Sequence, residues 1–388
     1  MVEKLKRFNW ISFAAMIALT AVGTVAIYSA GHARAEAAFH GTWKAMLSTA
    51  VAGLAVYFTL AFFDYRRYLD WFAVPAYAGA IVLLTAVLIF GDTVYGGRRW
   101  LWFFQPSEIS KICVIAFLAW LYGGGAEFRR RRRFGGFLAA AAAVGVPAFL
   151  ILLEPDLGTT LTLVPATLLM LLVARVWRRG LLTVFCTALV AAAAVIGAVY
   201  EAEKPGVSEE RREAILKYVP LKPHQVKRVR VFLFPDEDIH GAGYNLRQAK
   251  ISIGSGGFSG KGFGKGETNH LKYLPPSISM NDFIFCVYAE ETGFIGSIVL
   301  LALFGMLLIP GVWTAYTAAD DCGRLLALGI SALIFAHVFI NIAMSIGIVP
   351  ITGLPLPLIS AGRTFLVTVM AGLGLTQSVA IYGRDIKK

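Results

Sequence analysis

Long apolar runs separated by short polar segments dominate the chain. Each run approaches the roughly 20 residues that an α-helix needs to cross ~30 Å of hydrocarbon. The pattern predicts ten spans, at about residues 9–29, 41–63, 71–91, 107–123, 137–153, 158–176, 181–200, 283–310, 325–347 and 364–382. We therefore expect an all-α polytopic membrane protein whose 388 residues form a single membrane domain.

One polar segment is far longer than the others. Residues 201–282, between the seventh and eighth spans, hold 13 Lys plus Arg and 10 Asp plus Glu. The first half of this segment has a partly helical pattern, and the second half is rich in glycine. A segment of this size on a compact bundle is usually functional or disordered. The order in its pattern favours function.

The charge of the chain follows from membrane topology. Only 15% of residues are charged and the net charge is +12, whereas soluble domains average about 25% charged residues. One set of alternate short loops holds 17 Lys plus Arg, and the opposite set about 5. The positive-inside rule makes the first set cytoplasmic. Both termini are then cytoplasmic, the 201–282 loop is extracytoplasmic, and no nucleic-acid partner is expected.

Two local features add little chemistry. The five arginines at 129–133 are interpreted as a topology anchor that touches anionic lipid. The four cysteines are scattered, without the spacing of a metal site or a disulfide framework.

Charges inside or at the ends of spans are costly and usually functional. Near the outer end of the fourth span, Glu108 and Lys111 stand three residues apart and can pair on one helical face. Arg98, Arg99 and Trp100 precede them. These three residues fit an aromatic belt with snorkelling arginines, or an anion clamp, because arginine binds phosphate in a bidentate manner.

Two further clusters lie on the same predicted face. Glu154 and Asp156 stand between the fifth and sixth spans, where Asp156 fits either a helix N-cap or a site. The glycine-rich stretch 253–266 lacks the spacing of a nucleotide-binding P-loop. Its glycines allow turns and close backbone approach, and Lys261 and Lys265 add positive charge.

Asp282 marks the junction between the long loop and the eighth span. It fits an N-cap, although the preceding Asn281 could serve instead. Glu290 and Glu291 follow inside the apolar run, so at least one of them must face the bundle interior.

The Pro- and Gly-rich segment 347–365, which includes Arg363, lies between the last two spans. Non-helical backbone at membrane depth needs burial in protein or a hydrated cavity. The groups together predict an outward-facing groove for an amphiphile with an anionic head and a lipid tail.

Five stretches of the sequence resemble the motifs of a known family. The stretches GGRRW…FQPSEISK, EPDLGTTL, GYNLRQAKISIGSGGFSGKGFGKG, LKYLPPSISMNDFIFCVYAEETGFIG and GLPLPLISAGRTF are similar, in order, to the motifs of the SEDS (shape, elongation, division and sporulation) proteins. The segments FPDEDIHGAGYN and IGSGG…GKG favour the elongation branch over the division branch.

The resemblance implies a peptidoglycan glycosyltransferase in the bacterial inner membrane. Such proteins polymerise lipid II at the outer face, together with a class B penicillin-binding protein and other membrane proteins of the elongation complex. The aspartate of the family's TDFIF motif matches Asp282, and its outer-loop tryptophan matches Trp100. The acid of the family's EPDLG motif matches Asp156, and the Glu and Lys of its PSE..K motif match Glu108 and Lys111.

The sequence departs from the family pattern in two places. Here LPPSISMNDFIF stands where the family usually has LPE.HTDFIF, and SAGR stands where it has SYGG. The resemblance therefore implies no role for the residues just before Asp282, for Ala361 or for Arg363.

The expected reaction is an inverting displacement of undecaprenyl pyrophosphate, with Asp282 as the candidate general base. Arg98, Arg99, Lys111, Arg363 or a bound divalent cation (Mg²⁺ or Mn²⁺) would stabilise the leaving group. No cofactor is otherwise expected. A lipid II flippase, a structural scaffold and a division-type family member remain alternatives.

Overall fold

The computed structural model describes most of the chain. The described residues are 2–32, 39–94, 97–102, 104–124, 134–204, 206–219, 221, 223–235, 238, 241–270 and 273–383. The arginine run at 129–133 lies outside them.

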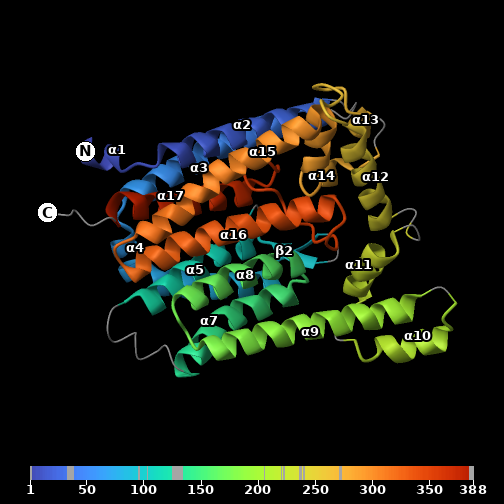
Figure 1. Cartoon of the computed structure of the whole chain (residues 1–388), viewed down its shortest axis with the longest axis horizontal. Helices are drawn as coiled ribbons and strands as arrows, with labels where there is room; N and C mark the ends of the chain where they lie inside the picture. The colour runs from blue at the N-terminus through green and yellow to red at the C-terminus, as the bar shows by residue number, and fades with distance from the viewer. Residues whose placement is uncertain are drawn as a thin grey trace.

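Ten long helices form the bundle in the described part of the chain (Figure 1). They are α2 (Trp10–His32), α3 (Thr42–Phe62), α4 (Tyr65–Phe90), α5 (Pro106–Gly123), α7 (Phe134–Leu153), α8 (Leu157–Val173), α9 (Arg178–Glu203), α15 (Ile284–Thr317), α16 (Asp321–Ser345) and α17 (Arg363–Tyr382). Each overlaps one predicted span. Eight are long and apolar enough to cross a membrane, while α5 and α8 are shorter, with 18 and 17 residues. The polytopic, helical fold class is confirmed.

The central helices differ sharply in burial from the peripheral ones. In α17 and α16, 83% and 67% of the most apolar stretch is buried, against 6% in α9. The helices α3 and α17 approach closely where a Cβ atom on Gly374 would lie 2.6 Å from the Tyr57 carbonyl oxygen. Small residues allow this kind of contact between membrane helices. The core therefore lies around α16 and α17, and α9 forms an outer edge (Figure 1).

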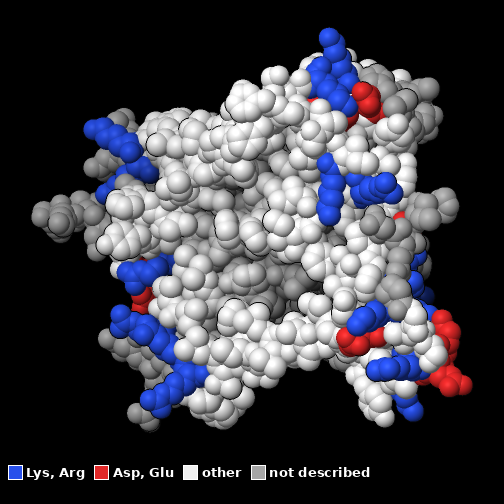
Figure 2. Space-filling model, turned by 45° about the vertical axis from the view of Figure 1, so that its right-hand side comes forward, with Lys and Arg blue, Asp and Glu red and all other residues white. Residues whose placement is uncertain are grey.

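The segment 201–282 is built of short helices at one end of the bundle (Figure 1). They are α10 (Glu209–Leu216), α11 (Pro223–Leu233), α12 (Ala242–Ser255), α13 (Glu267–His270) and α14 (Pro276–Ser279). The N-terminal helix α1 (Val2–Lys6) lies at the opposite end, where Lys4 Nζ donates to Tyr382 Oη at 2.7 Å. Charged side chains gather at these two ends, with a largely uncharged belt between them (Figure 2).

Two local features differ from the sequence prediction. A short antiparallel hairpin, β1 (Asp92–Val94) and β2 (Gly97–Trp100), precedes α5. Helix α15 continues to Thr317, past the predicted end at 310, and it bends at Gly293, where φ is 68°. The 24 residues after the bend would span about 36 Å at 1.5 Å per residue. The residues before the bend therefore belong to the end of the bundle that carries the short helices.

Candidate active site

Asp282 lies in the turn between α14 and α15 and does not cap the helix. The N-cap position of α15 is Phe283, and no side chain caps it. Among the described residues, no hydrogen bond or ion pair reaches the Asp282 carboxylate. Gly353 lies close by, since a Cβ atom added to it would be 3.5 Å from Asp282 Oδ2. The carboxylate is therefore not committed to a structural contact.

Two arginines and a second carboxylate set the electrostatics of Asp282. Burial and, to a small extent, Asp156 raise the pKa of Asp282 to about 6, against the opposing effect of Arg228 and Arg99. Arg228 comes from α11, Arg99 from β2, and Asp156 from the start of α8. Elements distant in sequence thus bring opposite charges together around one acid.

Neither arginine is neutralised by an ion pair within the described chain. Arg99 Nε donates to the Glu154 carbonyl oxygen at 3.2 Å, and its Nη2 donates to that of Pro155. Arg228 Nη1 donates to the Thr352 carbonyl oxygen at 3.1 Å. Backbone carbonyls hold these side chains in place without cancelling their charge. Both guanidinium groups can therefore still bind an anion.

Sequence reasoning missed Arg228, which the packing of α11 places on the inward face of that helix. Gln225 and Val231, three residues before and after it, are both buried. Positions three apart share a helical face, so Arg228 lies on the inward face, whereas Lys227 is exposed.

Asp156 caps α8 and also influences the Asp282 carboxylate. It caps α8, accepting from the Thr159 amide at 3.1 Å and from Thr159 Oγ1 at 2.8 Å. Gln105 Nε2 also donates to Asp156 Oδ2 at 3.1 Å. The N-cap interpretation is correct, and the same carboxylate still acts on Asp282.

Glu154 is buried without a partner. Its side chain is fully inaccessible, and neither carboxylate oxygen has a hydrogen-bond partner among the described residues. Burial and, to a lesser extent, Asp156 raise the pKa of Glu154 to about 8, against the opposing effect of Arg99. Glu154 therefore carries a proton at neutral pH.

The expected pair of Glu108 and Lys111 forms inside the bundle. Lys111 Nζ lies 2.8 Å from Glu108 Oε2 and 2.8 Å from His337 Nε2, and all three side chains are buried. The sequence analysis did not identify His337. An ammonium group at this depth needs such partners, so the charge of Lys111 is already used within the fold.

The glycine-rich stretch holds the bend of α15. A Cβ atom on Gly260 would lie 2.2 Å from the Glu291 carbonyl oxygen, and the amide of Lys261 donates to the Glu290 carbonyl oxygen at 3.0 Å. Lys261 Nζ also forms an ion pair with Glu290 Oε1 at 2.8 Å. Glu290 and Glu291 are both buried. The structure thus places Lys261 in a structural contact, whereas Lys265 is exposed.

The remaining predicted residues lie around this end of the bundle. Arg98 is exposed and donates to the Leu88 carbonyl oxygen at 3.2 Å, near the end of α4, as a snorkelling arginine would. Trp100 is half-buried at the end of β2 and pairs in register with Asp92. Arg363 is exposed at the first position of α17.

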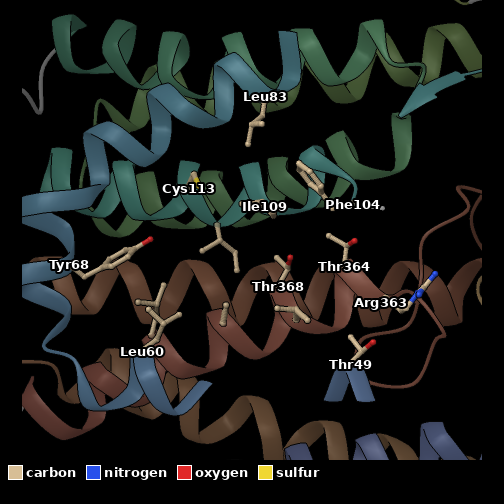
Figure 3. A pocket seen from close by; sticks show the side chains of 14 residues that line it. Thr49, Leu60, Tyr68, Leu83, Phe104, Ile109, Cys113, Arg363, Thr364 and Thr368 are labelled. Atoms are coloured by element: carbon tan, nitrogen blue, oxygen red, sulfur yellow. The ribbon is translucent and has the colours of Figure 1, made fainter. Parts of the chain in front are cut away.

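Arg363 also lines a cavity of about 690 Å³ between α3, α4, α5 and α17 (Figure 3). Most of the lining is apolar. The other lining residues are Thr49, Leu60, Tyr68, Leu83, Phe104, Ile109, Ile112, Cys113, Thr364, Val367, Thr368, Ala371 and Leu375. Figure 3 shows Arg363 at one end of this cavity, near Thr49 and Thr364. A cationic group at one end and an apolar interior give the cavity an amphiphilic lining.

No group of three or more His, Cys, Asp or Glu side chains that could hold a metal ion occurs among the residues that the structure describes.

The fold and its charged end define a polytopic helical membrane protein with an acid–arginine site beside an apolar cavity. Residues 9–385 match the sequence model of the FtsW/RodA/SpoVE family, described as "Cell cycle protein". The chain belongs to this family, as the SEDS resemblance indicated.

Relatives of known name align over nearly the whole chain. The peptidoglycan glycosyltransferase MrdB of Escherichia coli K12 is 34% identical over 90% of this chain and 88% of its own length. The crystal structure of the Thermus thermophilus rod shape determining protein RodA has a TM-score of 0.67 at 25% identity, covering 97% of this chain and 98% of that one. A chain from a structure on the coordination of polymerization and crosslinking by a peptidoglycan synthase complex has a TM-score of 0.73 at 27% identity, covering 96% of this chain and 97% of that one.

Proposed function

We propose that the chain is a peptidoglycan glycosyltransferase that polymerises lipid II during cell elongation and maintenance of rod shape. The names of its relatives support the activity, and its structural similarity to a rod shape determining protein supports the elongation role. One observation in the site carries the proposal. The carboxylate of Asp282 is uncommitted and lies under the influence of two arginines that form no ion pairs in the described chain.

Asp282 is the general base of the proposed reaction. The 4-hydroxyl of the acceptor sugar attacks C1 of the donor sugar, and Asp282 takes the hydroxyl proton as the new C–O bond forms. The bond from C1 to the pyrophosphate oxygen breaks with inversion, and undecaprenyl pyrophosphate leaves with the bonding electron pair. A general base works best with a pKa near the working pH. A pKa of about 6 leaves Asp282 ionised at neutral pH and more basic than an ordinary aspartate.

Arg99 and Arg228 stabilise the leaving pyrophosphate in this proposal. Guanidinium groups bind phosphate oxygens in a bidentate geometry, and a preorganised cation favours the transition state because negative charge develops there. Of the lysines considered from sequence, Lys111 and Lys261 already form ion pairs. The two arginines held by carbonyls are therefore better candidates.

The apolar cavity accommodates the prenyl chain, and Arg363 contacts the anionic group at its end. The amide of Ala361, two residues before Arg363, donates to the Met280 carbonyl oxygen at 3.1 Å. This contact brings the start of α17 close to the turn that carries Asp282. One lipid-linked sugar could then have its tail in the cavity and its head near the acid.

A reconstituted assay tests the activity. Purified protein is incubated with labelled lipid II and a class B penicillin-binding protein whose crosslinking activity is disabled, and the products are separated on a gel. We expect a glycan ladder that Asp282→Asn abolishes, because the amide cannot accept the proton. Asp70→Asn, at an exposed residue of α4, is the matched control and should leave the ladder intact.

Two outcomes would contradict the proposal. A ladder of normal intensity from folded Asp282→Asn would remove Asp282 as the base. The lack of a ladder with any penicillin-binding partner, together with lipid II transport in vesicles, would favour the flippase alternative.

We further propose that the protein lies in the bacterial inner membrane with both termini cytoplasmic and the 201–282 segment outside. The distribution of Lys and Arg supports this orientation. In a cysteine-free background in whole cells, a membrane-impermeant maleimide should label Lys265→Cys and leave Lys4→Cys unlabelled until the cells are opened. The reverse pattern would overturn the orientation.

A further inference from the structure

Three successive backbone carbonyls at the turn before α15 accept hydrogen bonds from later parts of the chain. The Met280 carbonyl oxygen accepts from the Ala361 amide at 3.1 Å. The Asn281 carbonyl oxygen accepts from Ser360 Oγ at 2.6 Å. The Asp282 carbonyl oxygen accepts from Asn341 Nδ2 at 2.8 Å. The donors come from α16 and from the segment that joins α16 to α17.

Asn341 connects three parts of the chain. Its side chain is fully buried on α16, and Nδ2 also donates to the Leu354 carbonyl oxygen at 2.6 Å. Both hydrogens of the amide nitrogen are thus used, one on the turn and one on the α16–α17 connection. An amide is well suited to this task because a single nitrogen offers two donors.

Ser360 makes a second connection of the same kind. Its hydroxyl donates to the Asn281 carbonyl oxygen and accepts from the Leu356 amide at 2.8 Å. The side chain is buried, with 2% exposed. Like Asn341, it joins the turn at 280–282 to the Pro- and Gly-rich segment.

These contacts fix the backbone of Asp282 while leaving its carboxylate free. A carboxylate held by its own hydrogen bonds would be stabilised in its charged form and would become a weaker base. Holding the main chain instead restricts the position of the acid without this cost. A displacement of about 1 Å in a reacting group can lower a rate on the order of 100-fold.

We propose that Asn341 and Ser360 are positioning residues, which hold the Asp282 backbone so that its carboxylate meets the acceptor hydroxyl. The proposal rests on the proposed glycosyltransferase function.

The test measures kcat and KM for lipid II with Asn341→Ala and Ser360→Ala. We expect kcat to fall by about 10- to 100-fold with KM within about twofold, because substrate contacts remain while the base is displaced. Ser360→Thr keeps the hydroxyl and should recover most of kcat. Ser331→Ala is the matched control, since Ser331 is a buried serine of α16 that donates within its own helix, to the Ala327 carbonyl oxygen.

The outcomes separate this inference from the proposed function. If Asp282→Asn is inactive but folded Asn341→Ala and Ser360→Ala keep wild-type kcat, the positioning role is wrong and the activity stands. An active Asp282→Asn would instead contradict the assignment of the base. If Asn341→Ala does not fold, Ser360→Ala decides, because it removes only one oxygen atom. A loss of kcat in the Ser331→Ala control equal to that in Ser360→Ala would also overturn the inference.

Discussion

At the scale of single residues, the site depends on an acid whose basicity is set by its neighbours. Burial raises the pKa of Asp282, and Arg228 and Arg99 lower it. The same two arginines are proposed to bind the leaving group. Their charge therefore affects both the base and the transition state, and these two effects have different experimental signatures.

The pH profile of the reaction reports the first effect. In the proposed reaction Asp282 acts as the ionised base, so kcat/KM should rise with pH through a midpoint near 6. Arg228→Gln removes a charge that lowers this pKa, and its midpoint should lie higher than that of the wild type, whatever its rate. Arg324→Gln is the control. Arg324 forms an ion pair with Asp321 at 2.7 Å, so its loss should leave the midpoint unchanged. A midpoint that stays fixed or moves down in Arg228→Gln would contradict the described electrostatics.

Glu154 gives a prediction about stability. Its pKa is raised from 4.5 to about 8 in the folded protein, so the folded state binds a proton more tightly than the unfolded state. Wild-type stability should therefore decrease as pH rises from about 5 to 8 through this group. Glu154→Gln resembles the protonated side chain, and its thermal unfolding in detergent should show a weaker decrease over that range. Glu213→Gln, at an exposed residue, should follow the wild type, and identical profiles for all three proteins would disprove the assignment.

At the scale of elements, the bend in α15 separates a membrane span from a part of the site. Gly293 has φ of 68°, and a Cβ atom there would lie 2.3 Å from the Gly260 amide nitrogen. The bend therefore requires glycine both for its conformation and for the approach of the glycine-rich stretch.

Gly293→Ala should destabilise the protein by at least about 1–2 kcal/mol, the cost of a left-handed conformation for a residue with a side chain. The measurement is thermal unfolding in detergent. Gly305→Ala is the control on the same helix, because the nearest atom to a Cβ there is Ile309 Cδ1 at 3.9 Å. Alanine favours a helix more than glycine does, so this control should be neutral or stabilising. Equal stability of the two variants would show that the bend does not need glycine.

The elements also show what the sequence could predict. Apolar runs located every long helix, because helix length and hydropathy are local properties. The extension of α15 to Thr317 escaped prediction because a helix can leave the hydrocarbon without ending. The hairpin of β1 and β2 escaped because it is only seven residues of strand.

The sequence predicted only part of the candidate site. Motifs and the cost of buried charge selected Asp282, Arg99, Asp156 and the pair of Glu108 and Lys111. They could not show that Arg228 lies near Asp282, because that depends on how α11 packs. Asn341 was missed because it acts on a backbone carbonyl, which leaves no pattern of charge or period.

At the scale of the whole molecule, the site is assembled at the end of the bundle opposite the α1 helix (Figure 1). The well-buried α16 supplies Asn341, while α11 supplies Arg228 from the segment 201–282. The proposed base is thus held by the well-buried centre of the bundle. One proposed phosphate contact comes from the layer of short helices at its end.

That layer is attached to α9, the least buried of the eight candidate membrane spans. Arg230 of α11 forms an ion pair with Glu203 at the end of α9 at 3.2 Å, and the rings of Phe234 and Tyr200 stack with their centroids 5.6 Å apart. With 26 residues, α9 would measure about 39 Å, more than the ~30 Å of a typical hydrocarbon core.

A helix longer than the bilayer core tilts to fit it, and its angle changes with bilayer thickness. Because only 6% of the most apolar stretch of α9 is buried, its tilt can respond to bilayer thickness and move α11, which is attached to its far end. The distance between Arg228 and Asp282 would then depend on lipid chain length. Bilayer thickness would then regulate the enzyme. The polymerisation rate in vesicles should vary with acyl-chain length even at constant lipid II density.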